Sequence, residues 1–259
     1  MGERDDIVIR ECTTVEEFDQ CVLLQREAFG LPDLELSPRR HLIVARSVGG
    51  FTLGAFGGGR MVGFVLNQLA VRRRPQTGAE ETCGYSHMMA VAQEYQNRGV
   101  GARLKWAQRA RVLADGRRFI RWTWDPAQSR NAHFNLNRLG VVVRSYAVNY
   151  YGTDYSTVTG KFGDPLGLDS DRLVAEWELD SPRVEAFARG ETPGPEGEPE
   201  ASVAIPPNWG ELVREDPSAA RSELLRVRAE FQAAFASGLV CAGFERDPAR
   251  PRYLLYGDG

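Results

Sequence analysis

The stretch Met89–Ala102 combines an apolar run with a polar, glycine-rich turn, and of all segments it is best suited to hold a ligand. The residues Tyr85–Val91 favour a buried strand, and a helix is expected from Gly99 to about Asp115. Gly99 and Gly101 would let a ligand approach the backbone closely. The first amide N–H groups of the helix have no acceptor within it and lie at the positive end of its dipole. The stretch therefore predicts a cradle for a phosphate or pyrophosphate.

Other ligand-binding motifs fit this sequence poorly. No Gly-Lys-Ser/Thr follows the turn, which excludes a Walker A loop, and the Gly-x-Gly-x-x-Gly spacing of dinucleotide-binding folds is missing. The other glycine cluster, Gly57–Gly59, has no helix after it and predicts a turn between strands at Phe51–Phe56 and Met61–Val71. The chain has 4 cysteines without metal-ligand spacing and 3 histidines, so we expect no metal site.

Strands and helices alternate around the predicted cradle. Thr14 and Glu17 predict a capping box at the start of a helix that Gly30 ends, whereas residues 31–48 show a mixed pattern. The basic triplet Arg72–Arg74 is expected in a polar loop that runs to Glu81, and holding an acidic substrate is the alternative. Further strands are expected at 6–10, Phe119–Trp124, Val141–Tyr151 and Arg172–Leu179, with helices at Ser129–Leu139 and after Pro182.

The spacing Gln96-x-x-Gly99-x-Gly101 after a strand resembles the acetyl-CoA signature of the GNAT N-acetyltransferases, Gln/Arg-x-x-Gly-x-Gly/Ala. Met89-x-Val91 is similar to the strand end that precedes this signature in the family. The order of the expected elements also looks like the GNAT fold. The resemblance therefore implies an α/β (α+β) fold, with a mixed, mostly antiparallel sheet and helices on both faces.

Segments farther along the chain resemble a large, poorly characterised branch of GNAT proteins that carries a C-terminal extension. We expect residues 6–180 to form the acyl-CoA-binding domain and residues 181–200 to form a short helix and a flexible acidic linker. Residues 201–259 predict a β-α-β-β extension that packs on the sheet or extends it. The segments that carry this second resemblance are Trp122–Pro126, Asn131–Leu136 and Asp171–Leu179.

The resemblance implies that acetyl-CoA, or another acyl-CoA, lies between Tyr85–Val91 and Phe119–Trp124, as two parallel strands that splay apart. Backbone groups of Met89 and Val91 would bond the pantetheine arm, and the Met89 amide would polarise the thioester carbonyl. Asn131 would reach the donor from the next helix, two residues out of the usual register. The implied donor-binding residues are Met89, Val91, Gln96, Asn97, Arg98, Gly99, Val100, Gly101 and Asn131.

Acyl transfer to an amine needs a base for the amine and a proton for the leaving thiolate. His87 is expected on the same strand face as Met89 and Val91 and titrates near neutral pH, so it is the candidate base, or else a hydrogen-bonded core residue. Asp125, at the end of the second strand, is a second catalytic candidate, or else a strand-end cap. Leu136 replaces a Tyr that the family often has. The remaining candidates for the proton donor are Tyr146, named first, and then Tyr150, Tyr151 and His133.

Composition narrows the range of partners. The chain has 32 basic and 35 acidic residues and thus lacks the basic surplus of nucleic-acid-binding proteins. Its longest apolar stretches are too short for a membrane span, and the charged start does not fit a secretory signal, so we expect a cytoplasmic protein. The expected function is an N-acyltransferase that acts on a small amine or amino-acid-like acceptor in a ternary complex. The alternatives are a CoA-binding protein without catalysis and a peptide or protein N-acetyltransferase, and a homodimer is left open.

Overall fold

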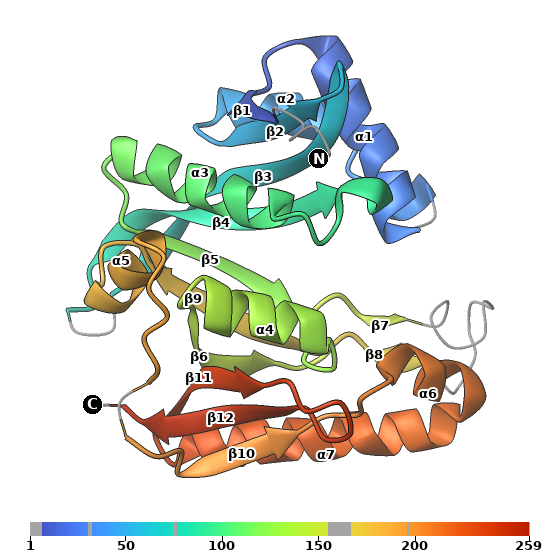
Figure 1. Cartoon of the computed structure of the whole chain (residues 1–259), viewed down its shortest axis with the longest axis vertical. Coiled ribbons are helices and arrows are strands. Elements are labelled where there is room, and N and C mark those ends of the chain that lie inside the picture. Colours follow the sequence, from blue (N-terminus) through green and yellow to red (C-terminus); the bar gives the residue numbers. More distant parts are fainter. Residues whose placement is uncertain (1–6, 31–32, 75–76, 155–166, 196, 259) are drawn as a thin grey trace, which may run out of the picture. The chain divides into compact units, whose positions relative to one another are not determined.

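A computed structural model describes residues 7–30, 33–74, 77–154, 167–195 and 197–258 (Figure 1). The chain divides into two compact units, with the boundary between Arg121 and Trp122. This division differs from the segments 6–180, 181–200 and 201–259 expected from the sequence, which remain a prediction. No helix among the described residues is long and apolar enough to span a membrane.

The first unit contains an antiparallel sheet with strand order β1-β2-β3-β4, and β5 joins it in parallel beside β4. The ladder between β4 and β5 contains the pairs Gly84–Ile120 and Tyr85–Arg121. Within this unit, Ser86 and residues 88–91 of β4 therefore have a ladder partner only in β3. The strands are β1 (Val8–Glu11), β2 (Phe51–Gly57), β3 (Arg60–Arg73), β4 (Glu80–Val91) and β5 (Phe119–Trp124), the last crossing the boundary between the units.

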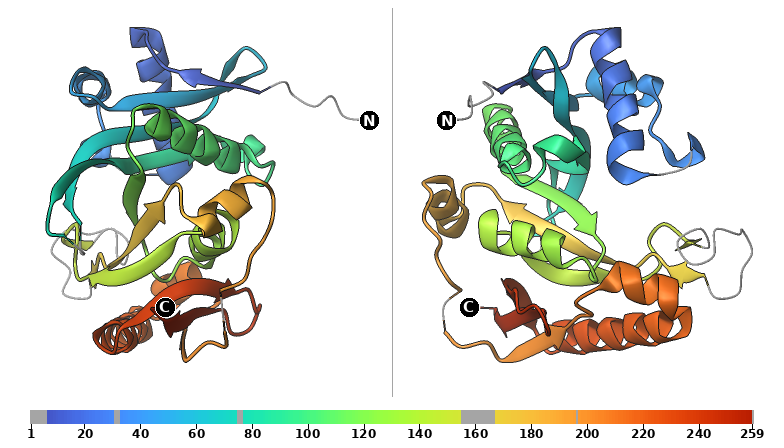
Figure 2. Two further views of the ribbon diagram at one scale, coloured as in Figure 1. Left: turned by 90° about the vertical axis from the view of Figure 1, so that its left-hand side faces the viewer. Right: turned by 45° about the vertical axis from the view of Figure 1, so that its right-hand side comes forward.

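Helices cover both faces of this sheet. Figure 2 shows α1 (Val15–Phe29) and α2 (Arg39–Ser47) on one face and α3 (Val100–Ala114) on the other. The expected start and end of α1 are confirmed, because Thr14 and Glu17 form the capping box and Gly30 has a left-handed φ of 61°. The sequence did not indicate α2 within residues 31–48. This helix is short, and only Leu42 and Ala45 are buried. Its sequence therefore shows almost no helical periodicity of apolar residues.

The hairpin of β3 and β4 corrects the expectation that Arg72–Glu81 is a loop. Arg72 lies directly across from Glu81, and Arg73 lies across from Glu80. The Nε atom of Arg72 is 2.5 Å from Oε1 of Glu81. Opposite charges on paired strands attract each other. The first two residues of the basic triplet, Arg72 and Arg73, therefore belong to the paired strands and not to a solvated loop tip.

The second unit has the strand order β5-β9-β6-β11-β12-β10, in which β6 pairs antiparallel with β9 and β11. The residues after 200 therefore extend a sheet that the preceding residues begin. The mixed, mostly antiparallel fold expected from the sequence is confirmed. The remaining elements are β6 (Val142–Ala147), β7 (Thr153–Asp154), β8 (Leu168–Asp169), β9 (Arg172–Glu178), β10 (Ala201–Ala204), β11 (Leu239–Glu245), β12 (Arg252–Gly257), α4 (Ser129–Arg138), α5 (Pro182–Ala188), α6 (Trp209–Glu215) and α7 (Pro217–Ala236).

Side chains of the C-terminal strands hold the end of β5 within the second unit. The Tyr253 hydroxyl donates to the Pro126 carbonyl at 2.8 Å and accepts from the Trp124 indole at 3.2 Å. Tyr253 is fully buried, so both bonds are shielded from water. The extension is thus part of the packing that fixes the loop after β5.

Candidate functional site

The start of α3 has unusual backbone geometry. Asn97 and Gly99 both have left-handed φ angles, 61° and 80°, and Gly99 is the N-cap. No side chain caps this helix, and no described group accepts a hydrogen bond from the amides of Gly99, Val100 or Gly101. Three backbone donors therefore stand together at the positive end of a helix of 15 residues.

The two glycines have different surroundings. A Cβ at Gly99 would meet no atom within 4 Å, so the space above the helix start is open. A Cβ at Gly101 would lie 3.4 Å from Met89 Cε and 3.9 Å from Val91 Cγ2. The structure therefore brings the predicted strand residues against the predicted helix start.

The residues between β4 and α3 shape the turn. The Gln96 side chain donates to the Val91 carbonyl at 3.1 Å and its amide donates to Gln93, so Gln96 closes the loop. Arg98 is exposed, and its guanidinium lies 5.4 Å from the centre of the Tyr95 ring. Its positive charge therefore lies within the turn that leads into the open amides.

A β-bulge changes the expected position of His87. Leu66 pairs with Met88 and Asn67 pairs with Ser86, so His87 is an extra residue in β4. Alternation is broken there, and His87 points away from Met89, which lies against α3. The expectation that His87 shares a face with Met89 and Val91 is wrong for this reason. A one-residue bulge cannot be recognised from the pattern of β4 alone.

His87 belongs to a histidine cluster, which we define as Ser37, His41, Gln68 and His87. The Nε2 atom of His87 is 3.4 Å from the Ser37 hydroxyl, and its ring meets that of His41 edge to face at 5.4 Å. The Nε2 atoms of His41 and Gln68 are 2.6 Å apart. Burial lowers the pKa of His87, and the neighbouring His41 lowers it further. Ser37, His41 and Gln68 were not predicted as site residues, because their contacts form only when α2 packs against the sheet.

The opposite face of β4 carries a sealed network, which we call the α3-face network and define as Asn67, Ser86, Lys105 and Gln108. The Lys105 side-chain nitrogen donates to the Ser86 hydroxyl at 2.8 Å and to Gln108 Oε1 at 3.2 Å. Gln108 in turn donates to Asn67 Oδ1 at 3.0 Å. All four residues are at most 5% exposed. Burial therefore lowers the pKa of Lys105 well below its ordinary value.

Three of the predicted site residues lie in the second unit. Asp125 Oδ1 accepts from the Ala127 amide at 2.9 Å, and burial raises the pKa of Asp125 despite this bond. Asn131 is exposed on α4. Tyr146 donates its hydroxyl proton to Asp171 Oδ2 at 2.7 Å, and burial, then Asp171, raises the pKa of that hydroxyl.

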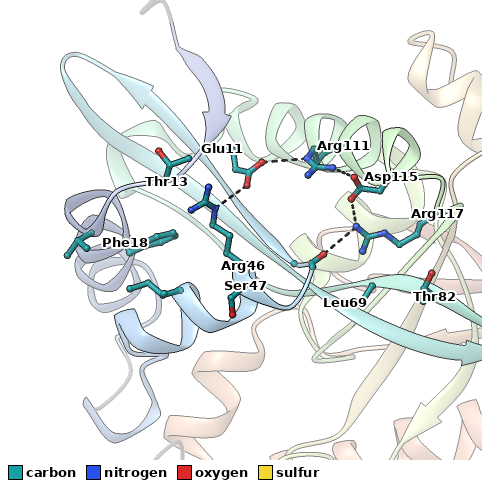
Figure 3. Close-up of a pocket in the computed structure, with 14 residues that line it drawn as sticks. Glu11, Thr13, Phe18, Arg46, Ser47, Leu69, Thr82, Arg111, Asp115 and Arg117 are labelled. Carbon is teal, nitrogen blue, oxygen red and sulfur yellow. Dashed lines mark hydrogen bonds and ion pairs between the residues drawn. The ribbon is translucent and has the colours of Figure 1, made fainter.

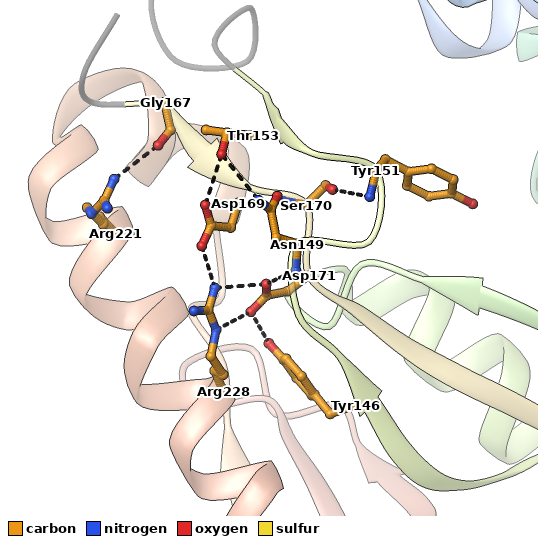
Figure 4. Close-up of polar contacts among 10 residues, drawn as sticks. All are labelled: Tyr146, Asn149, Tyr151, Thr153, Gly167, Asp169, Ser170, Asp171, Arg221 and Arg228. Atoms are coloured by element: carbon orange, nitrogen blue, oxygen red, sulfur yellow. Dashed lines mark hydrogen bonds and ion pairs between the residues drawn. The ribbon is translucent and has the colours of Figure 1, made fainter.

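Tyr146 is one member of a larger polar cluster beside α7 (Figure 4). Arg228 donates to both carboxylate oxygens of Asp171, at 2.8 and 2.9 Å, and also binds Asp169. Asp171 also accepts from the Asn149 amide and is 1% exposed. This buried carboxylate is satisfied by four bonds, so the Tyr146 hydroxyl is a fixed part of a structural junction.

The other candidate proton donors differ in exposure. Leu136 is fully buried, as a core residue would be. Tyr150 and Tyr151 are 44% and 58% exposed and stack edge to face on each other. Burial, followed by two nearby arginines, lowers the pKa of His133. Among the described residues, no group of three or more His, Cys, Asp or Glu could hold a metal ion.

A separate pocket of about 830 Å³ lies near the C-terminal end of α3 (Figure 3). Alternating charges link its walls, because Glu11 binds Arg46 at 3.6 Å and Arg111 at 3.5 Å, and Asp115 binds Arg111 and Arg117. The cradle is about 20 Å away, at the other end of α3. Arginines near helix C-termini are favoured by the helix dipole. The charged residues that line this pocket are therefore explained by helix stability without a ligand.

Residues 18–140 match the family model described as the acetyltransferase (GNAT) family. This matched segment is a GNAT acetyltransferase domain. None of the curated proteins matches the sequence. The likeness to the family in sequence is therefore that of residues 18–140 to the family model.

Solved GNAT structures share the fold at low sequence identity. Arabidopsis thaliana NAA60 in complex with acetyl-CoA is 12% identical with a TM-score of 0.52, over 68% of this chain and 99% of that chain. The Escherichia coli ribosomal-protein-S18-alanine N-acetyltransferase is 13% identical with a TM-score of 0.51, over 68% of this chain and 95% of that one. A putative GNAT acetyltransferase from Desulfovibrio desulfuricans is 15% identical with a TM-score of 0.50, over 67% and 99%. These likenesses concern the fold.

Proposed function

We propose that this GNAT protein is an acyl-CoA-dependent N-acyltransferase, with acetyl-CoA as donor and a small amine or amino-acid-like compound as acceptor. The observation that supports this most is the start of α3. There the amides of Gly99, Val100 and Gly101 have no described acceptor, and they adjoin the end of β4, where residues 88–91 pair only with β3 within the unit. Such a set of donors suits the pyrophosphate of coenzyme A.

Backbone groups do most of the binding in this proposal. The amides at the start of α3 bond the pyrophosphate, and Arg98 adds a positive charge beside them. Met89 and Val91 bond the pantetheine arm through their main chain, and Gln96 acts by closing the loop. Coenzyme A supplies the acyl group as a thioester, whose carbonyl the Met89 amide polarises. The residues proposed to hold the donor remain Met89, Val91, Gln96, Asn97, Arg98, Gly99, Val100, Gly101 and Asn131.

Proton handling falls to three proposed residues. His87 accepts the proton of the acceptor's ammonium group, and its lowered pKa keeps it neutral, and so able to act as a base, at physiological pH. Asp125, whose pKa burial raises, is the second candidate base. Tyr146 remains a candidate acid for the thiolate, but it can act only after its bond to Asp171 breaks.

A thiol-release assay tests this function. The full chain is given acetyl-CoA and a panel of small amines, free amino acids and short peptides with free α-amines. Release of CoA with small amines or amino acids supports the proposal. Release only with peptides indicates the peptide or protein N-acetyltransferase, an activity of the kind named for the Escherichia coli structure.

A CoA-binding protein without catalysis is the alternative that Leu136 favours. This residue stands where the family often has a tyrosine, and it is fully buried. Saturable binding of acetyl-CoA without release by any amine would contradict the proposed function and support this alternative.

A further inference from the structure

The histidine cluster fixes proton positions as well as ring positions. A Gln amide nitrogen is always a hydrogen-bond donor, so the 2.6 Å contact with Gln68 makes Nε2 of His41 an acceptor. With Nε2 as the acceptor in this contact, the ring proton of His41 is on Nδ1. Gln68 lies on β3 and His41 lies on α2, so the contact also joins the helix to the sheet.

Ser37 is held in place by its main chain. Its amide donates to Gln25 Oε1 at 2.8 Å, and its carbonyl accepts from Gln25 Nε2 at 3.1 Å. Gln25 is 1% exposed and Ser37 is 9% exposed, so α1 fixes this residue from inside the fold. The Ser37 hydroxyl then reaches Nε2 of His87. The contact with Ser37 uses Nε2 of His87, so the other ring nitrogen, Nδ1, does not take part in it.

The bulge gives His87 its place beside these groups. As the extra residue of β4, His87 lies on the face that α1 and α2 cover, together with Tyr85, whose ring centre is 6.4 Å away. The titratable groups that face His87 from the described elements are Tyr85 on its own strand and His41 on α2. No described carboxylate contacts the ring of His87, so no negative charge stabilises its protonated form there.

We propose that Ser37, His41 and His87 form one proton-handling unit, in which Nδ1 of His87 accepts a proton from the acceptor's ammonium group. Ser37 and His41 are positioning residues in this unit. The Ser37 hydroxyl accepts from Nε2–H of His87 in both protonation states, which keeps the lone pair on Nδ1. The step moves one proton from R–NH3⁺ to Nδ1, leaving R–NH2 and an imidazolium. This inference rests on the proposed function for the identity of the acceptor.

The role of His41 is electrostatic. The two ring centres lie 5.4 Å apart, so positive charge on both rings would be mutually repulsive. Repulsion between like charges keeps His87 neutral to lower pH than burial alone would. A base that stays neutral to lower pH keeps the acid limb of the pH profile below the ordinary histidine range.

Nitrogen NMR of the ¹⁵N-labelled full chain tests the unit without any turnover. Long-range ¹H–¹⁵N spectra report which ring nitrogen carries the proton, and single substitutions assign the 3 histidines. We expect Nε2–H for His87 and Nδ1–H for His41 at neutral pH. In Ser37→Ala, His87 should become a mixture of both tautomers. His41→Phe keeps a ring at this position and should raise the pKa of His87, because the repulsion from His41 is removed.

His133→Phe is the matched control, because His133 is not among the groups that shift the pKa of His87, so the titration of His87 should stay unchanged. An Nδ1–H tautomer for His87, or an unchanged His87 titration in His41→Phe, would overturn the inference. The acid limb of CoA release should move to higher pH in His41→Phe, in step with the NMR titration. If the NMR results are as expected but no amine releases CoA, the proposed function is wrong, whereas the coupling between His41 and His87 is confirmed. If CoA is released but the acid limb of the pH profile does not move in His41→Phe, the proton-handling unit is wrong and the proposed function is supported.

Discussion

Two polar clusters flank the bulge of β4, one on each face of the sheet, and they differ in their access to solvent. In the α3-face network, Asn67, Ser86, Lys105 and Gln108 are at most 5% exposed and satisfy one another. In the histidine cluster, the rings of His41 and His87 are half-buried. Ser86 and His87 are neighbours in sequence, yet one belongs to each cluster.

This difference separates two tasks along one strand. A buried polar network is costly when broken, so it can specify the register of β3 against β4 and the position of α3. A half-open cluster can exchange protons with a substrate. We expect substitutions on the α3 face to change stability and substitutions in the histidine cluster to change turnover.

His87→Gln should give the largest effect. Removal of a general base reduces kcat/KM by about 100-fold or more, whereas the free energy of unfolding should change by less than about 1 kcal/mol. Thiol-release kinetics and urea unfolding of the same preparation measure the two quantities. Unchanged kcat/KM would remove His87 from the mechanism.

Gln108→Leu should be the most destabilising change on the α3 face. It leaves Asn67 Oδ1 without its 3.0 Å donor and Lys105 with one acceptor fewer. Unsatisfied buried groups cost about 1–3 kcal/mol each, so we expect a loss of about 3 kcal/mol in urea unfolding. A loss below about 1 kcal/mol would show that the network does not hold α3 in place.

Ser86→Ala tests the separation one residue away from His87. Lys105 keeps its bond to Gln108, so the expected loss of unfolding free energy is about 1 kcal/mol. The kcat of CoA release should stay within about twofold, because Ser86 faces α3. A large fall in kcat with little loss of stability would break the division of tasks between the two faces.

Lys105→Met should have the smallest effect at neutral pH and change the pH dependence instead. The pKa of Lys105 is lowered on folding, so the unfolded chain binds more protons, and the free energy of unfolding rises with pH toward the ordinary lysine range. Stability is lost as pH falls from that range toward the lowered pKa. Urea unfolding from pH 7 to 10 should show this rise in the wild type and a flatter profile in Lys105→Met. Equal slopes would mean that Lys105 stays charged in the fold.

Local signals in the sequence predicted many of the elements and the start of the candidate site. Thr14, Glu17 and Gly30 mark the ends of α1, because caps depend on neighbouring residues. The glycine turn before α3 was predicted for the same reason. Caps and turns are decided within a few residues, so one sequence is enough to find them.

Features that depend on pairing between distant segments were not predicted. The bulge at His87 arises from the register of β3 on β4, and the alternation within β4 carries no trace of it. His41 and Ser37 reach His87 only because α2 packs against the sheet, and α2 itself has a weak pattern. The ladder of Arg72 with Glu81 likewise requires knowledge of which residues face each other.

Titration of the full chain with acetyl-CoA by calorimetry tests the central claim most directly. A valine at Gly101 would place branched carbons next to the open amides and against Met89, whereas Ala102→Val makes a similar change one residue farther along α3. We predict one saturable site in the wild type, at least about tenfold weaker binding in Gly101→Val, and affinity within about twofold in Ala102→Val. Absence of binding in the wild type, or equal affinity in both variants, would contradict the assignment of the α3 start as the acyl-CoA site.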